Sequence, residues 1–224
     1  LMDRAMNAAS ISSALLALSA DLAACERMAI LGEGNVSARL DVATFLVKAS
    51  GTQLGTLRPE HLVAVRFEPL LEVMAGDDAC DDAAMEALLL EARVDPAALK
   101  PSVESLFHAW LLGLPGVGYV GHTHPVAVDQ ILCSPHAAAF ARERLIPDQV
   151  VYCGEASVLV PYVDPGLVLA RTIAERVSAF RTETGTTPKT ILLENHGAIG
   201  LGATAAEAYA ALAMLEKSAR IFAG

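Results

Sequence analysis

Basic side chains are scarce in this 224-residue sequence, in which 16 Lys and Arg stand against 26 Asp and Glu, for a formal net charge of −10. A nucleic-acid-binding surface needs clustered lysines and arginines, and no dense run of them occurs. Charged residues make up only 19% of the chain and hydrophobic residues 54%, a composition that excludes intrinsic disorder. We therefore expect a single folded domain over residues 1–224 and no nucleic-acid partner.

Long apolar runs and paired cysteines are also missing. The uncharged stretch 5–20 is interrupted by Asn7 and by four serines, which is too polar for a membrane span. Its apolar positions continue at helical spacing to Leu22 and Met28, which favours an amphipathic helix over 4–30 and not a signal peptide. None of the four cysteines stands in a CxxC pair. We expect a cytoplasmic protein with reduced thiols and no membrane partner.

The hydrophobic pattern predicts alternating strands and helices. Strands are expected over 36–40, 45–49, 62–67, 116–124, 157–163 and 190–193. Helices are expected over 4–30, 77–93, from 101 onward, 125–132, 165–181 and 204–222. The first two strands resemble a hairpin, which requires antiparallel pairing. The pattern thus favours an α/β fold in which helices cover both faces of a mixed sheet.

Histidines follow two of the predicted strands. His122 and His124 are two residues apart at a strand end, so their side chains point to the same side. Taken alone, this pair is better explained by polar residues that hydrogen-bond to the backbone. His196, however, follows the strand 190–193 and precedes a glycine. Three neutral imidazoles that leave one position open are typical of a catalytic zinc site.

A carboxylate and several small residues complete the set. Glu104 lies in the first turn of the helix expected from 101, where an acidic residue often only complements the helix dipole. Short glycine loops beside strands can present N–H groups and hydroxyls to an anion, although each loop alone is only a turn signal. The residues of these loops are Gly34, Asn35, Ser50 and Gly51.

In their order and spacing, five motifs resemble the class II aldolase/adducin family over almost the whole chain. The motifs are Gly34-Asn35-Val36-Ser37-Ala38-Arg39, Ala49-Ser50-Gly51, Pro101-Ser102-Val103-Glu104, His122-Thr123-His124-Pro125 and Asn195-His196-Gly197. The resemblance implies a three-layer α/β/α sandwich around a mixed, mostly antiparallel sheet. It also implies a homo-oligomer, usually a tetramer, with active sites between subunits.

The same resemblance assigns roles to residues. It implies Zn²⁺ or another divalent ion on His122, His124 and His196, with Glu104 as the catalytic acid/base. The substrate phosphate would be held by Gly34, Asn35, Ser50, Gly51 and Ser102. Family aldolases take a second acid from a tyrosine of a neighbouring subunit. Tyr152 is the candidate here, although structural packing is the better explanation of Tyr152.

The expected activity is zinc-dependent cleavage of a ketose 1-phosphate, of the fuculose or rhamnulose deoxyketose type, into a dihydroxyacetone-phosphate-like ketone and an aldehyde. Three sibling reactions stay open: decarboxylation of a 3-oxo acid phosphate, dehydration of a thiosugar phosphate and sugar-phosphate epimerisation. Epimerases of the family usually carry Asp at the position of Glu104. Val103 departs from the Ser or Thr of many phosphate-handling relatives. A non-catalytic adducin-like module is disfavoured, because the three histidines and Glu104 are all present.

Overall fold

The computed structural model describes residues 2–25, 27–76 and 81–224. Within these residues, seven strands form one sheet in the order β3-β2-β1-β4-β7-β6-β5. All neighbouring strands pair antiparallel except β5 and β6, which are parallel. The strands are β1 (Asn35–Arg39), β2 (Thr44–Lys48), β3 (Leu62–Arg66), β4 (Tyr119–Thr123), β5 (Val158–Val160), β6 (Thr190–Leu193) and β7 (Gly197–Gly202). The prediction of a mixed, mostly antiparallel sheet is confirmed.

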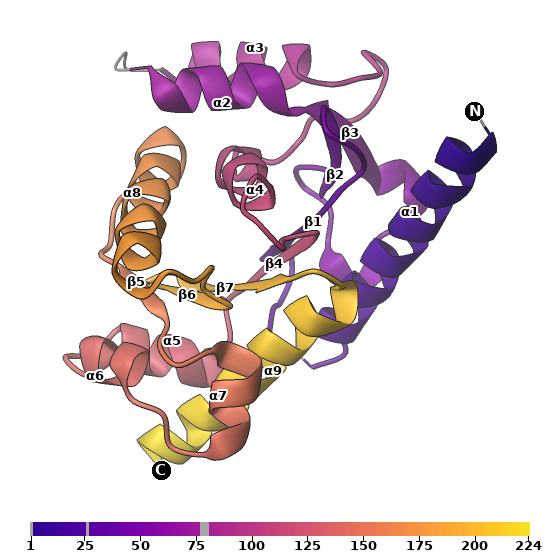
Figure 1. Ribbon diagram of the computed structural model, residues 1–224. Helices are drawn as coiled ribbons and strands as arrows, with labels where there is room; N and C mark the ends of the chain where they lie inside the picture. The colour runs from indigo at the N-terminus through magenta and orange to yellow at the C-terminus, as the bar shows by residue number, and fades with distance from the viewer. Residues whose placement is uncertain (1, 26, 77–80) are drawn as a thin grey trace.

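Helices cover both faces of this sheet and bury a separate apolar cluster on each (Figure 1). One face packs against α2 (Phe67–Ala75), α3 (Asp82–Glu91), α4 (Ser105–Leu112) and α8 (Leu167–Thr184). The other packs against α1 (Met2–Ala23), α5 (Val126–Leu132), α6 (Ala137–Arg142), α7 (Pro147–Cys153) and α9 (Ala205–Ala223). The three-layer α/β/α sandwich is therefore confirmed. Among the described helices, none is both long and apolar enough to span a membrane.

The first helix is shorter than predicted. It ends at Ala23 and not at residue 30, because the segment that follows pairs with the end of β4. The carbonyls of Met28 and Arg27 accept backbone hydrogen bonds from His124 and Val126, at 3.0 and 2.8 Å. This pairing replaces the helical continuation that the apolar spacing predicted, and it places the segment next to a predicted site residue.

Other element boundaries also differ from expectation. The helix predicted from 101 begins at Ser105, because Pro101 forms an isolated bridge with Ala49. The helix predicted over 77–93 is observed as α3, and its first residues, with Cys80, lie outside the described residues. Three helices, α2, α6 and α7, were not predicted, nor were the short 3₁₀ turns Leu54–Thr56 and Pro59–His61.

Strand β7 was not predicted either, because its sequence is rich in glycine. The packing of α9 explains one of these glycines: a Cβ on Gly200 would lie 2.7 Å from the carbonyl oxygen of Ala208 and 2.8 Å from Cγ of Leu212. The helix thus approaches the strand more closely than a side chain would allow. Tertiary contact with α9, and not local strand preference, therefore explains why these glycine-rich residues form a strand.

Candidate metal centre

Three histidine rings meet at one end of the sheet. His122 lies near the end of β4, His124 directly follows that strand, and His196 lies in the turn between β6 and β7. One ring nitrogen of each lies within 4.8 Å of the others, and the ring centroids are 5.0–5.1 Å apart. The Nε2 atoms of His122 and His124 are 3.2 Å apart. Nitrogen donors gathered around one point match the ligand set of zinc and related divalent ions.

The state of the rings also fits a metal ion. Nδ1 of the buried His122 lies 3.0 Å from the Ala198 carbonyl oxygen, so Nδ1–H donates there and Nε2 is the nitrogen that faces the cluster. Burial, together with the charges of His122 and His196, lowers the pKa of His124 to about 3. A neutral imidazole is the form that ligates metal. The three histidines are therefore suited to hold a divalent cation.

Gly197 allows the strands to come together beside the rings. A Cβ at this position would lie 2.5 Å from the Thr123 carbonyl oxygen and 2.9 Å from Cδ2 of His124. The preceding Asn195 adopts a left-handed conformation, with φ of 54°, a region that asparagine tolerates better than most residues. The Asn-His-Gly sequence therefore makes a turn tight enough to bring His196 to the other two rings.

Gly197→Ala should lower the free energy of unfolding by about 1–3 kcal/mol, because the added methyl group overlaps backbone and a histidine ring. Gly32→Ala is the matched control, since a Cβ there meets nothing within 4 Å. Urea unfolding of both variants measures the difference. Equal midpoints for the two variants would contradict the close approach at Gly197.

Glu104 completes the cluster from the start of α4, a helix that packs on one face of the sheet. It is the N-cap residue of α4, and its Oε1 lies 3.5 Å from Nε2 of His122 and 3.6 Å from Nε2 of His196. Burial alone would raise the pKa of Glu104, but the charge of His122 and hydrogen bonds from His122, His196 and Asn35 hold that pKa well below its usual range. The residue is therefore a carboxylate, available to accept a proton.

Asn35 holds the other oxygen of Glu104, and Ser102 holds its backbone N–H. Asn35 Nδ2 donates to Oε2 of Glu104 at 2.5 Å and to Oγ of Ser102 at 3.0 Å. Ser102 Oγ also accepts the backbone N–H of Glu104 at 3.3 Å. Gly34, just before Asn35, has a left-handed φ of 77°, and a Cβ there would lie 2.7 Å from the His122 carbonyl oxygen. These predicted residues thus lie together around Glu104.

The predicted loop of Ser50 and Gly51 lies beside Ser102. The Ser50 N–H donates to the Lys100 carbonyl at 2.9 Å, which ties this loop to the segment before α4. Lys48, which sequence reasoning missed, is buried beneath the loop, where Nζ donates to the Thr52 carbonyl at 2.7 Å. Burial lowers the pKa of Lys48, whereas the charge of Glu104 raises it. A buried cationic group thus supports the loop. The sequence signal that could have identified Lys48 is its position two residues before Ser50.

A second missed feature is a buried polar pair beneath Glu104. His108 lies one turn further along α4, and its Nδ1 is 2.6 Å from Oγ of Ser37 on β1. Both side chains are fully buried, and His108 Nε2 has no hydrogen-bond partner. Burial lowers the pKa of His108 to about 3, so the ring is neutral. Asn35 and Ser37, both on β1, therefore contact two successive turns of the segment that begins at Glu104. The only sequence signal for His108 was its helical spacing of four residues from Glu104.

The Ser37–His108 pair should make stability depend on pH. The unfolded ring titrates near pH ~6.5 and the folded ring at about 3. The unfolded chain therefore binds a proton that the folded chain does not, and stability falls as the pH decreases through this window. Replacing the pair with Ser37→Ala and His108→Leu should remove about 1.5 kcal/mol of the loss between pH 6.5 and pH 5. Urea unfolding at both pH values tests this; the same loss in the double variant and the parent would contradict it.

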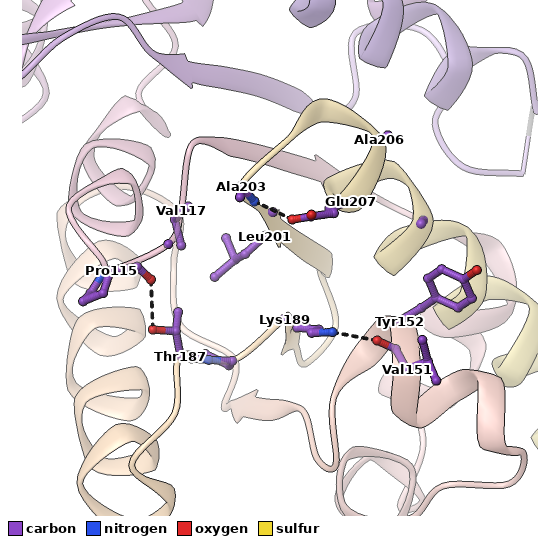
Figure 2. A pocket seen from close by; sticks show the side chains of 14 residues that line it. Pro115, Val117, Val151, Tyr152, Thr187, Lys189, Leu201, Ala203, Ala206 and Glu207 are labelled. Atoms are coloured by element: carbon purple, nitrogen blue, oxygen red, sulfur yellow. Dashed lines mark hydrogen bonds between the residues drawn. The ribbon is translucent and has the colours of Figure 1, made fainter.

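Tyr152 lies far from the histidine cluster within its own chain. It lines a cavity of about 580 Å³ together with Val151, Lys189 and Leu201 (Figure 2). This cavity lies at the beginning of β4 and β6 and the end of β7, whereas the histidines lie at the opposite ends of those strands. Tyr152 therefore does not reach the histidine cluster of its own chain, and a role in the site of a neighbouring subunit stays a prediction.

Comparison with known proteins agrees with this architecture. Residues 13–223 match the family model of the Class II Aldolase and Adducin N-terminal domain. The N-terminal class II aldolase domain of a conserved protein from Thermoplasma acidophilum superposes with a TM-score of 0.74 and 25% identity, covering 94% of this chain and 92% of that one. L-fuculose-1-phosphate aldolase from Thermus thermophilus has the same fold, with a TM-score of 0.68, 23% identity and coverage of 96% and 94%.

Two curated relatives are more diverse. The chain is 28% identical over 169 residues to the uncharacterized oxidoreductase YuxG of Bacillus subtilis (strain 168), covering 75% of this chain but only 22% of that protein. It is 28% identical over 154 residues to methylthioribulose-1-phosphate dehydratase of Geobacillus kaustophilus (strain HTA426), covering 65% of this chain and 71% of that enzyme. Because the family model extends from within α1 to the end of α9, the chain belongs to the class II aldolase and adducin family.

Proposed function

We propose that this protein is a metal-dependent aldolase that cleaves a ketose 1-phosphate, of the deoxyketose type, into a dihydroxyacetone-phosphate-like ketone and an aldehyde. The observation that carries the proposal is the position of Glu104, whose Oε1 lies within 3.6 Å of two histidine nitrogens in the cluster. A proton-transfer group and a set of metal ligands thus share one centre. The fold shared with L-fuculose-1-phosphate aldolase supports it.

Cleavage between C3 and C4 of the ketose leaves negative charge on an enediolate. A divalent ion on His122, His124 and His196, with Zn²⁺ as our proposal, would supply Lewis acidity toward the enediolate oxygens. Glu104 transfers the proton at C3: in synthesis its carboxylate removes this proton, and in cleavage it first gains a proton, balanced by the one that the C4 hydroxyl loses, and then delivers it to C3. Asn35 holds Oε2 of Glu104, so that Oε1 remains directed toward the histidines.

The proton of the C4 hydroxyl needs a second group. We propose that Tyr152 of a neighbouring subunit serves it, within a cytoplasmic homotetramer whose active sites lie between subunits. Tyr152 is suited to such a role because 45% of its surface is exposed, at the far end of its own sheet. This arrangement requires a homo-oligomer, whose assembly can be measured by light scattering.

The phosphate would lie against Gly34, Asn35, Ser102 and the loop of Ser50 and Gly51. Backbone N–H groups and small hydroxyls of such loops bind anions without a basic surface. The buried Lys48 adds positive charge beneath this loop. Val103 is 37% exposed beside Ser102 and offers no hydroxyl. We therefore expect fewer contacts to the phosphate than a serine or threonine at position 103 would permit.

Dehydration of a thiosugar phosphate is the second candidate function. It is favoured by the 28% identity to methylthioribulose-1-phosphate dehydratase, which spans 65% of this chain. The same ligands and the same carboxylate could remove a proton beside the ketose carbonyl, with hydroxide leaving from the next carbon instead of a carbon–carbon bond breaking. The two reactions differ in their products and can therefore be separated directly.

The test is to purify the protein, determine its divalent metal content, and screen the loaded protein against ketose 1-phosphates, with Glu104→Gln as the inactive control. An aldehyde and a triose phosphate are the expected products. Conversion of methylthioribulose 1-phosphate to a dehydrated diketone, without cleavage of any ketose phosphate, would move the assignment to the dehydratase. Absence of stoichiometric divalent metal after loading would rule out the metal centre.

A further inference from the structure

The two ring nitrogens of His124 face different groups. Nε2 lies 3.2 Å from Nε2 of His122, inside the cluster. Nδ1 lies 3.8 Å from Oε1 of Glu33, a residue that sequence reasoning did not select. The Glu33 carboxylate therefore lies on the Nδ1 side of the His124 ring. It does not lie on the Nε2 side, where a metal ion would bind.

The Glu33 carboxylate is held in place by its own turn. Its Oε2 accepts the Ile30 N–H at 2.9 Å, and its backbone N–H donates to the Ile30 carbonyl at 3.0 Å. Within this turn, Leu31 adopts a left-handed conformation, with φ of 52°. A leucine in that region is strained, and such strain persists only where surrounding contacts impose it.

The segment carrying Glu33 is also bonded to the backbone around His124. The His124 N–H donates to the Met28 carbonyl at 3.0 Å, and the Val126 N–H donates to the Arg27 carbonyl at 2.8 Å. These two bonds join residues 27–28 to the chain on either side of Pro125. Backbone hydrogen bonds thus connect the segments that carry Glu33 and His124. The distance between the two side chains therefore depends on the backbone as well as on side-chain rotation.

His122 shows what such a partner does. Its Nδ1–H donates to the Ala198 carbonyl oxygen at 3.0 Å, which leaves Nε2 as the nitrogen directed into the cluster. Histidine ligands in general donate their second N–H to a carbonyl or carboxylate, which fixes both the tautomer and the orientation of the ring. His124 needs an equivalent acceptor, and the carboxylate facing its Nδ1 is that of Glu33.

We propose that Glu33 is the positioning residue of His124, accepting its Nδ1–H and so holding Nε2 ready for the divalent ion. This role rests on the proposed metal centre. The observed 3.8 Å separation is about 1 Å longer than a formed N–H···O bond. The role therefore requires the two side chains to approach each other by about this amount when the ion binds.

Two variants separate hydrogen bonding from charge. Glu33→Gln removes the negative charge and keeps one acceptor oxygen, which can face His124 Nδ1 while its NH₂ group replaces the oxygen that accepts from Ile30. Glu33→Ala removes the charge and the acceptor together. Glu175→Ala, on an exposed part of α8, is the control for loss of a distant carboxylate. If Glu33 acts through its hydrogen bond, Glu33→Ala should be clearly worse than Glu33→Gln.

The experiment measures Zn²⁺ affinity by competition with a chelating dye, together with ¹⁵N-edited NMR of the histidine rings in the zinc-loaded protein. We expect the zinc Kd to rise about 10- to 100-fold in Glu33→Ala, less in Glu33→Gln, and not at all in Glu175→Ala. The Nδ1–H signal of His124 should disappear in Glu33→Ala. That of His122, bonded to Ala198, should remain and serve as the internal control for an intact fold.

The possible results are distinguishable. An affinity in Glu33→Ala within twofold of the parent protein, with the His124 signal retained, would overturn the role of Glu33 and leave the proposed function standing. Equal losses in both Glu33 variants with unchanged ring signals would also overturn it, because charge alone would then account for them. A parent protein that binds no zinc would overturn the metal centre and, with it, the role of Glu33.

Discussion

Glu104→Gln should lower kcat on the ketose 1-phosphate about 10²- to 10⁴-fold, the range typical for loss of a general acid/base. Glutamine keeps the size of the side chain and an oxygen that can accept the Asn35 hydrogen bond, which is 2.5 Å long in the parent protein. It cannot carry a proton between substrate atoms. The variant should therefore fold and bind one divalent ion per chain while losing turnover.

Steady-state kinetics with metal analysis of the same samples measures both effects. Glu175→Gln on α8 is the matched control, since it makes the same chemical change at an exposed distant position. If Glu104→Gln retained a kcat within tenfold of the parent protein, Glu104 would not be the proton-transfer group. If it lost metal along with activity, its principal role would be that of a ligand.

His196→Ala should weaken binding of the divalent ion by more than about 100-fold, beyond the upper range for loss of a residue that only supports a ligand. His196 is suited to this test because it lies in the turn between β6 and β7 and not within a strand. Activity should fall in parallel with metal content. His136→Ala, which removes an exposed histidine outside the cluster, should change neither quantity.

Isothermal titration with Zn²⁺ or Co²⁺ measures this loss, and thermal unfolding without metal checks that the variant is folded. Retention of parent-like affinity by a folded His196→Ala protein would remove the third ligand from the account. The remaining pair, His122 and His124, would then have to be explained as strand-end residues that hydrogen-bond to the backbone.

The principal elements could be predicted from sequence because their patterns are local. The Ile-Leu-Leu run after Thr190 predicted β6 with its observed bounds, since a run apolar on both faces is typical of a buried strand. Strand β7 was missed because three glycines lower its strand preference. Gly200 is required by the close approach of α9, a tertiary contact that no local sequence pattern predicts.

The residues of the candidate site also fall into two groups: those that local motifs identify and those that only tertiary packing brings to the site. His122, His124 and Glu104 were selected because they stand at strand and helix ends within recognisable motifs, and the structure brings them together with His196. Ser37 and His108 are 71 residues apart, and only the packing of α4 on β1 joins them. Glu33 was missed because it faces His124 only after the segment following α1 pairs with the end of β4.

Hydrogen exchange at C3 of dihydroxyacetone phosphate tests the central claim most directly, because it isolates proton transfer by Glu104 from the identity of the aldehyde. The metal-loaded protein is incubated with this ketone in D₂O and the C3 signals are followed by ¹H NMR. We predict that the parent protein exchanges one C3 hydrogen, and that Glu104→Gln and the metal-depleted parent do not. Exchange by the loaded parent no faster than by Glu104→Gln would contradict the account.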